Sequence, residues 1–476
     1  MYKKKMLHLL MLMGLIIMIA GCAPKEGMLK VDTMVAHGDY KGAALASSSE
    51  IDVDDRTQRD NLLWSLNAGL AYRFAHDENA SIKAFDESEW LIKYYEQQLL
   101  SSDLSQGMSS LLVNDTTMPY MGTQYDGVMA NTYKALSYMS KGDNDAARVE
   151  FNRAIDRQRR AKAYYAKLIE KNREAIEKKE KSDGNGVDTD NNMPAAERTL
   201  QQKYPSLYNF EAYPDFINPM VSYMAGIFAL KDGDRSKAFD LLKEAYGMNQ
   251  NNSYIKDDLA YVDALLSGGV QREKTHVWII IEDGLAPVKK EWRMDVPVWI
   301  FSNNLSYVSL ALPKIYPRSS AFESYSVLED DKSFHSQLLS DMDRVVLREF
   351  KEAYPAIMRR ALLSATTKAI IQYQTQRQAQ NSDGNAGLAW AVASLATTIY
   401  TIASTQADTR SWTTLPKRFD LISLERPDDG LIHIKTNTGL TLPAVNLSFS
   451  EDALIYVKMS RAGAKPSISV IPMGRP

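Results

Sequence analysis

The chain has 476 residues, of which 45% are apolar, as in an ordinary globular protein, and this length predicts two or three domains. Fifty-six basic residues stand against 59 acidic ones, and a net charge of −3 argues against a nucleic-acid-binding protein. The chain contains one cysteine, Cys22, which excludes a disulfide bond within the chain and any metal site built from several thiolates.

The first 21 residues predict a secretory signal peptide. Residues 3–5 are lysines, and Met6–Ala20 is apolar except for His8 but too short to span a membrane comfortably. Gly21 and Cys22 then complete the sequence IAGC, which resembles the lipobox of bacterial lipoproteins. We therefore expect cleavage between Gly21 and Cys22 and acylation of Cys22, with palmitate among the acyl chains. A signal anchor with an incidental cysteine is the alternative.

A lipidated Cys22 predicts attachment to the cell outer membrane on its periplasmic face. By resemblance to the sorting rule, Ala23 is not the aspartate that retains lipoproteins in the inner membrane. Residues 22–30 are expected to form a short tether. Cleavage leaves 53 basic and 59 acidic residues, a net charge near −6. A spare thiol would oxidise or pair wrongly in the oxidising periplasm, and lipidation removes the only one.

Residues 31–267 predict an all-helical domain, because proline is scarce and apolar residues recur at spacings of three and four. Two segments share a pattern of small and large residues at offsets 0, 3, 7, 12, 16 and 19, and a third segment follows it more weakly. The copies are Ala135, Tyr138, Gly142, Ala147, Phe151 and Ala154; Gly226, Ala229, Gly233, Ala238, Leu242 and Ala245; and Gly69, Tyr72, His76, Ser81, Phe85 and Ser88. Gly38-Asp39-Tyr40 with Ala43 is half of a degenerate copy.

Each copy predicts a helical hairpin in which small residues let two helices approach, a larger residue fills the space between them, and glycine occupies the turn. The offsets resemble those of the tetratricopeptide repeat, although the copies are 66 and 91 residues apart and not in tandem. A generic antiparallel helix bundle is the alternative. Such hairpins predict a concave groove for a protein partner on the first helices of the repeats, near Asn67, Asn131 and Tyr223.

One long helix is predicted from Asn144 to Lys181, a segment without proline or glycine that would reach roughly 60 Å. Its second half, rich in lysine and glutamate, is either a solvated face held by charge pairs or an arm that contacts a partner. Residues 182–194 predict a flexible loop. Its oxygen-bearing side chains from Asp183 to Asp190 lack the terminal glutamate of a calcium loop, so no metal is expected.

Residues 275–476 predict a second domain, which makes the fold class α+β: tetratricopeptide-like helices followed by a mixed sheet with an inserted helix hairpin. The insertion is expected at residues 332–407, interrupted near Pro355, and the strands on its two sides are expected to join in one sheet. The expected strands are Thr275–Ile281, Val296–Ser302, Tyr307–Leu312, Phe419–Leu424, Leu431–Lys435, Ala453–Met459 and Ser467–Ile471. The uncharged stretch Ala386–Ser404 predicts a buried helix; the alternative is that several copies line a pore with it.

Three segments of this domain carry a resemblance: Ile281–Pro287 (IEDGLAP), Ala311–Pro313 (ALP) and Ala407–Trp412 (ADTRSW), the last followed by Leu415-Pro416. They resemble a family of bacterial outer-membrane lipoproteins of unassigned activity with tetratricopeptide-like helices in the N-terminal half. The resemblance implies an envelope protein encoded near other small lipoproteins, including one similar to activators of penicillin-binding proteins. It supplies no catalytic residues.

The sequence predicts no catalytic residue, metal ligand or cofactor. It has no His-Glu-x-x-His motif, no glycine-rich phosphate loop and no Gly-x-Ser-x-Gly motif, and the histidines left after cleavage are too far apart for a local metal pair. Asp408, Arg410 and Trp412 are interpreted as structural; the alternative is a surface cluster that holds a peptide or glycan. A glycosidase acid pair would meet only in the fold and stays open.

The sequence therefore predicts a lipid-anchored periplasmic scaffold or adaptor, without enzymatic activity, that binds an envelope protein through its tetratricopeptide-like helices. Three alternatives stay open: a regulator of peptidoglycan synthesis, an oligomeric secretion or pore-associated component, and a cell-wall hydrolase. The expected partners are the membrane, through the N-terminal lipid, and an envelope or periplasmic protein, with a homo-oligomer as a further option and no nucleic acid.

Overall fold

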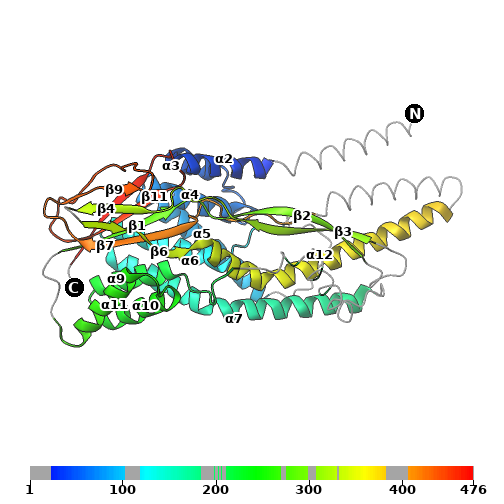
Figure 1. The fold of residues 1–476 in the computed structure, drawn as a ribbon. Helices are drawn as coiled ribbons and strands as arrows, with labels where there is room; N and C mark the ends of the chain where they lie inside the picture. Colours follow the sequence, from blue (N-terminus) through cyan, green and yellow to red (C-terminus); the bar gives the residue numbers. More distant parts are fainter. Residues whose placement is uncertain are drawn as a thin grey trace.

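The first half of the protein consists of paired antiparallel helices (Figure 1). The computed structural model describes residues 23–101, 118–183, 211–269, 275–297, 307–329, 332–381 and 406–474, with residues 198, 202 and 205. The pairs are α2 (Ala23–His37) with α3 (Tyr40–Ser49), α4 (Asn61–Phe74) with α5 (Glu78–Ser101), α6 (Gln124–Ser140) with α7 (Asn144–Asp183), and α9 (Pro219–Lys231) with α10 (Arg235–Met248); α11 (Ser253–Leu266) follows.

The four hairpins turn through the same backbone motif. A residue with positive φ follows the first helix, its N–H donates to the carbonyl three residues earlier, and the next N–H donates to the carbonyl five residues earlier. The positive-φ residues are Gly38, His76, Gly142 and Gly233, at 79°, 61°, 75° and 88°. The aspartates that follow them, Asp39, Asp77, Asp143 and Asp234, each accept the N–H three residues further on. The half copy at Gly38 is therefore a full hairpin.

The second half is built on a five-stranded sheet in the order β12-β11-β1-β7-β6. The strands are β1 (His276–Asp283), β6 (Gln337–Asp341), β7 (Arg418–Glu425), β11 (Asp452–Met459) and β12 (Ser467–Met473). β1 pairs in parallel with β11 and antiparallel with β7, so that Ile280 lies between Tyr456 and Leu421. Strands from both sides of the helical insertion therefore share one sheet, as the sequence predicts.

Both faces of this sheet are covered, and every residue of β1 and β11 is buried. Trp278 and Ile280 pack with the helices, whereas Val277 and Ile279 pack under two smaller sheets. The smaller sheets are β5-β4-β9 and β10-β8, formed by β4 (Tyr325–Glu329), β5 (Lys332–His335), β8 (Leu431–Ile432), β9 (Ile434–Thr436) and β10 (Val445–Asn446). Coverage on two sides explains why the sequence of β1 is a continuous apolar run and not an alternating one.

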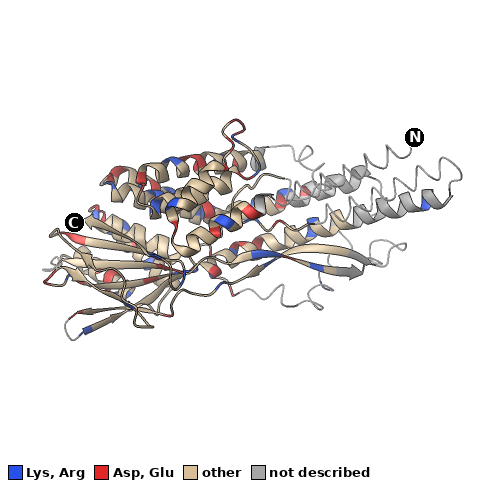
Figure 2. Cartoon of the chain, turned by 90° about the horizontal axis from the view of Figure 1, so that it is seen from above, with Lys and Arg blue, Asp and Glu red and all other residues tan. Residues whose placement is uncertain are grey.

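An arm projects from this body in both views of the chain (Figures 1 and 2). We define the arm as α7 from Ala166, α12 (Met342–Asn381) from Ala353, and a ribbon of two antiparallel strands, β2 (Val288–Pro297) and β3 (Tyr307–Tyr316). α12 packs on β3, and its side chains at a spacing of four are buried there: Tyr354, Met358 and Leu362.

Four expectations from the sequence need correction. The tether expected at residues 22–30 is helical from Ala23, because Val31 and Val35 on the same helix face enter the core. The helical insertion begins at Met342 and not at residue 332, because residues 332–341 form the strands β5 and β6. α12 also continues through Pro355, and the packing of its buried face on β3 offsets the lost hydrogen bond. The strand expected to begin at Val296 begins earlier, at Val288 of β2, and residues 298–302 of the expected strand lie outside the described residues.

Three predicted segments lie outside the described residues. These are the signal peptide with Gly21 and Cys22, the loop at residues 184–194, and the apolar stretch Ala386–Ser404. The predicted long helix, in contrast, is described: α7 runs without a break from Asn144 to Asp183.

Candidate interaction surfaces

The concave side of the helical repeats, where the sequence predicts an open groove, is filled by the sheet of the same chain. The exposed fractions of Asn67, Asn131 and Tyr223 are 3%, 2% and 0%. The side-chain oxygen of Asn67 accepts a 2.7 Å hydrogen bond from Thr414, which lies just before β7. These three residues therefore cannot contact a partner protein in this conformation, and the predicted groove is wrong as a free surface.

Two aromatic residues at the centre of this interface, one from the repeats and one from the sheet, hydrogen-bond to the same aspartate. The hydroxyl of Tyr223 in α9 donates to a carboxylate oxygen of Asp258 in α11 at 2.6 Å. The indole N–H of Trp278 in β1 donates to the same oxygen at 2.9 Å. One buried aspartate thus joins two helices to the central strand. Asn131 instead hydrogen-bonds within its own hairpin, to Glu150 and Arg157.

A fully buried charge pair lies between the helices and the sheet. The carboxylate of Glu282 in β1 lies 3.0 Å from the ammonium of Lys458 in β11, and neither side chain is exposed. Tyr133 from α6 and Tyr456 from β11 both donate to Glu282, at 2.7 and 2.5 Å. Burial lowers the pKa of the Lys458 ammonium and, with the nearby Glu282 charge, raises the pKa of both phenols. One member of this cluster, Tyr133, comes from the repeats, and the other three come from the sheet. The cluster therefore fixes the position of the repeats relative to the sheet.

Further ion pairs join the two halves around the edge of the interface. Arg318, just after β3, holds Asp32 of α2 at 2.7 Å. Lys231 at the end of α9 pairs with Asp452 at the start of β11. The hydroxyl of Ser467 in β12 donates to the carbonyl of Phe74, where α4 ends. Contacts at the centre and at three places on the edge make the two halves one body.

Asp408, Arg410 and Trp412 also belong to this interface and do not form an exposed cluster. Trp412 is 1% exposed, and its ring lies about 6 Å from the rings of Phe85 and Tyr133. Arg410 pairs with Asp408 at 2.8 Å, as the structural interpretation predicts, and also with Asp60 beside α4 at 2.8 Å. The alternative of a peptide or glycan site on this segment therefore lacks an exposed aromatic surface.

The residues of the repeat pattern lie between the paired helices. Ala135, Ala147, Phe151, Ala154, Gly226, Ala238, Leu242 and Ala245 are buried, Tyr138 is half-buried, and Gly142 and Gly233 occupy turns. The close approach is sharpest where glycine faces the large residue sixteen positions later. A Cβ at Gly226 would lie 3.0 Å from Leu242, and one at Gly69 would lie 2.7 Å from the Phe85 ring. Small and large side chains are thus complementary at this offset.

At the root of the arm, the carboxylate of Glu349 on α12 caps the N-terminus of α6. One oxygen accepts the N–H of Tyr125 at 2.6 Å, and the other accepts the N–H of Gln124 at 3.0 Å and the Tyr165 hydroxyl at 2.5 Å. A helix N-terminus favours an acid at this place. Burial nevertheless raises the pKa of Glu349 to about 8, and the neighbouring Asp126 carboxylate adds to the rise.

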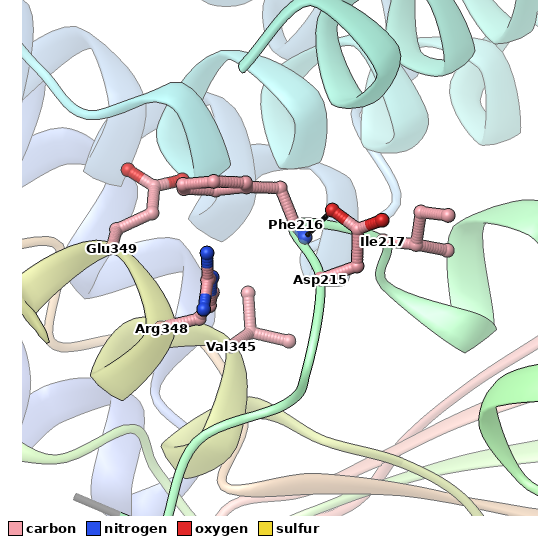
Figure 3. Close-up of a pocket in the computed structure, with 6 residues that line it drawn as sticks. All are labelled: Asp215, Phe216, Ile217, Val345, Arg348 and Glu349. Atoms are coloured by element: carbon pink, nitrogen blue, oxygen red, sulfur yellow. Dashed lines mark hydrogen bonds between the residues drawn. The ribbon is translucent and has the colours of Figure 1, made fainter. Parts of the chain in front are cut away.

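A small cavity opens beside this residue (Figure 3). Its lining residues are Asp215, Phe216, Ile217, Val345, Arg348 and Glu349. Its volume of about 10 Å³ has room for about one water molecule. The cavity is therefore too small to receive an organic substrate.

The described part of the chain contains no group of three or more metal-binding side chains. Nor is any helix of this part long and apolar enough to cross a membrane. His276 is buried and lies 2.7 Å from the Ser423 hydroxyl through its Nε2, so it is a core residue with a partner. His76 occupies the turn of the second hairpin.

Comparison with known proteins adds little to this picture. No protein-family model matches the sequence, and no curated protein is significantly similar to it. A tetratricopeptide repeat protein from Parabacteroides merdae is 13% identical over 50% of this chain and 98% of that one, with a TM-score of 0.14. Residues 1–338 of the assembly chaperone of RpL4 are 12% identical over 52% of this chain and 97% of that one, with a TM-score of 0.18. Matches this weak carry no argument about function.

Sequence reasoning missed the residues that join the repeats to the sheet. Tyr456 and Lys458 lie within the expected strand Ala453–Met459, and Glu282 directly follows the expected strand Thr275–Ile281, but these side chains meet Tyr133 only in the fold. One signal was present: a glutamate and a lysine each interrupt or end an otherwise apolar strand. A charge inside a strand that is buried on both faces needs a partner across the sheet.

Proposed function

We propose that the protein is a non-catalytic scaffold of the bacterial envelope, anchored to the periplasmic face of the outer membrane by lipidated Cys22. The observation that carries the scaffold proposal is the shared core, in which repeat residues such as Tyr133 and Tyr223 pack with sheet residues such as Trp278. The repeats then act as a rigid frame that holds the sheet and the arm in one orientation. The lipobox-like IAGC supports the anchor.

The partner of this scaffold is an envelope protein that binds the outer side of the repeats. The concave side is filled, so the second helices of the hairpins provide the free surface of the repeats. Three of these helices each present a large apolar side chain: Leu45 on α3 is 56% exposed, Trp90 on α5 37% and Val149 on α7 47%. Aromatic residues such as Trp90 are enriched in protein interfaces relative to the rest of the surface.

Site-specific photo-crosslinking in intact cells tests the partner surface. A crosslinker at Trp90 or Val149 is expected to capture an envelope protein, whereas one at Leu440, which is 48% exposed in the sheet domain, is not. Identification of a cell-wall synthase as the captured protein would specify the regulator of peptidoglycan synthesis. Equal capture from all three positions, or none, would contradict binding through the repeats.

The anchor is tested separately. Palmitate labelling is expected for the natural chain and not for Cys22→Ala, and the variant is expected to lose its outer-membrane fractionation. A natural chain that retains residues 1–21 and takes up no palmitate would show a signal anchor in place of a lipid anchor.

A further inference from the structure

The five-stranded sheet has two edge strands, β6 and β12, and the helical half of the chain bonds to the edge at β6. The carbonyl of Leu338 accepts a 2.9 Å hydrogen bond from the side chain of Asn252, which caps α11. The N–H of Asp341 donates to the hydroxyl of Tyr213 at 3.0 Å. Backbone groups of β6 are therefore already paired within the chain.

The edge at β12 is more open. Every residue of the neighbouring β11 is buried, whereas residues 468–470 of β12 are half-buried and Pro472 is exposed. Within the described residues, the N–H groups of Ile468 and Val470 have no hydrogen-bond acceptor outside the sheet. An edge strand in this condition can pair with a strand of another chain.

The hydrogen-bond pattern of β11 shows which backbone groups of β12 face outward. The N–H of Gly284 donates to the carbonyl of Met459 at 2.9 Å, so the odd-numbered residues of β11 direct their backbone groups toward β1. The even-numbered residues of β11 then bond to β12, where they lie opposite the odd-numbered residues. The N–H and C=O groups of Ile468 and Val470 therefore point away from the sheet.

The sequence of this edge, PSISVIP, is symmetric in the features that strand pairing uses. Pro466 and Pro472 lie three residues before and after Ser469. If two copies pair antiparallel about Ser469, Ile468 of each copy lies opposite Val470 of the other, and the two residues exchange both hydrogen bonds. Pro466 then lies opposite Pro472, and neither has an N–H to donate. The ladder therefore has four hydrogen bonds and ends at a proline on each side.

The charges at the two ends of the β11–β12 hairpin are also complementary in this arrangement. The turn between the strands carries the exposed Arg461, and the exposed Glu451 directly precedes β11 at the opposite end. Antiparallel pairing about a two-fold axis places the cationic end of each hairpin beside the acidic end of the other. A second copy of this chain thus matches the edge in hydrogen-bond donors, acceptors and charge.

We propose that β12 pairs with β12 of a second copy about a two-fold axis at Ser469, so that the sheets of the two chains become one continuous sheet. The contact goes beyond the scaffold function, because it joins two frames and leaves the outer side of both sets of repeats free. It is independent of the lipid anchor, since the edge belongs to the folded body. Four hydrogen bonds make a small contact, so the dimer is expected to dissociate on dilution.

Sedimentation equilibrium of the mature full-length chain with Cys22→Ser measures this pairing without the acyl chains. A monomer–dimer equilibrium is expected. Val470→Pro removes an outward N–H and no bond to β11, so it should weaken dimerisation at least ~10-fold by deleting two of the four hydrogen bonds between the chains. The matched control Val470→Ile keeps this N–H and should dimerise like the parent. Circular dichroism checks that both variants are folded.

A disulfide across the two-fold axis tests the register and does not depend on the proline variant. In the Cys22→Ser chain, Ser469→Cys is a nearly isosteric change. Two residues 469 would form a pair without hydrogen bonds, whose Cα atoms lie about 4.5 Å apart, within the ~4.4–6.8 Å range of disulfides. Mild oxidation is expected to link two chains at position 469 and not through Lys256→Cys, at an exposed position of α11.

The proposal is overturned if the chain stays monomeric at high concentration or if both cysteines link chains equally. A photo-crosslinker at position 469 that captures a different protein and no second copy would also overturn it, because the edge would then serve another partner. None of these results changes the outcome of crosslinking at Trp90 or Val149. Failure of the dimer and failure of the scaffold proposal are therefore distinguishable.

Discussion

The concave face of the repeats and the root of the arm both hold buried charge, but in different ways. At the concave face the Glu282 carboxylate has a cationic partner, Lys458, and two phenol donors. At the arm root, the hydrogen-bond donors to the Glu349 carboxylate among the described residues are neutral: two backbone N–H groups and one hydroxyl. The first arrangement brings opposite charges together, whereas the second depends on whether Glu349 carries a proton.

This difference indicates that the repeat–sheet interface and the attachment of the arm differ in stability. A buried ion pair with matching hydrogen bonds is rigid and specifies one arrangement of its two elements. A buried acid with a raised pKa is a less stable support, and it lies where α12 leaves the body. We therefore expect the repeats and the sheet to unfold together, and the attachment of the arm to be the more easily altered of the two.

The largest effect is expected from Lys458→Met, which leaves Glu282 buried without its cation. Loss of one member of a buried pair costs about 3–5 kcal/mol. Urea unfolding followed by circular dichroism should show this loss in a single transition. Lys465→Met, at an exposed position in the turn before β12, is the control and should stay within about 0.5 kcal/mol of the parent. Two separate transitions would contradict one cooperative body.

A smaller, pH-dependent effect is expected from Glu349→Gln. The folded chain keeps the Glu349 proton up to about pH 8, whereas the unfolded chain releases it near the ordinary value of 4.5. Between these values the folded state binds more protons, so this group lowers the free energy of unfolding as the pH rises, by roughly 2–4 kcal/mol from pH 5 to 8. The glutamine variant should lack that decline in the free energy of unfolding. The control Glu352→Gln, three residues further along α12, should keep it. Parallel pH profiles for all three chains would contradict a neutral Glu349.

A smaller loss in the free energy of unfolding, about 1–3 kcal/mol, is expected when the packing between the repeat helices is changed. Gly69→Ala places a methyl group against the Phe85 ring, where the Cβ would lie 2.7 Å away, and overpacking of this kind is destabilising. Gly247→Ala in α10 meets no atom within 4 Å and should stabilise its helix by up to about 1 kcal/mol. Thermal unfolding measures both. A neutral Gly69→Ala would show that the two helices are more loosely packed than the structure indicates.

The smallest effect is expected at the turns. His76→Gly relieves a side chain from a left-handed backbone and should stabilise the protein by about 1 kcal/mol, because glycine adopts positive φ without strain. Gly142→Ala makes the opposite change at the equivalent turn, where no atom lies within 4 Å of the added Cβ, and should cost a similar amount. Equal signs for the two variants would contradict a shared turn motif.

The sequence predicted most of the fold because its local signals agreed with the final structure. The spacing from Ala135 to Ala154 reflects packing within one hairpin, which depends on residues close in the chain. The apolar run of β1 likewise needs only burial on two faces. The helix interruption predicted near Pro355 was wrong, because the packing of α12 on the ribbon outweighs the local effect of a proline.

The candidate surfaces were predicted less well because they depend on how the two halves meet. Asn67 and Tyr223 have the polar and aromatic character of groove residues, and nothing local distinguishes a groove that awaits a partner from one filled by Thr414 and Trp278 of the same chain. The pairing of Arg410 with Asp408 could be predicted because the two residues are close in sequence. The contact of Arg410 with Asp60 could not, because it spans 350 residues.

The most direct test of the filled concave face is the reactivity of a thiol placed in it. In the Cys22→Ser chain, Asn67→Cys should react with maleimide only when the protein unfolds, whereas Val53→Cys, at a position that is 87% exposed, should react at once. Circular dichroism would confirm that both variants are folded. Rapid modification of the cysteine at position 67 in the folded protein would show an open groove and contradict the account in which the chain fills its own repeats.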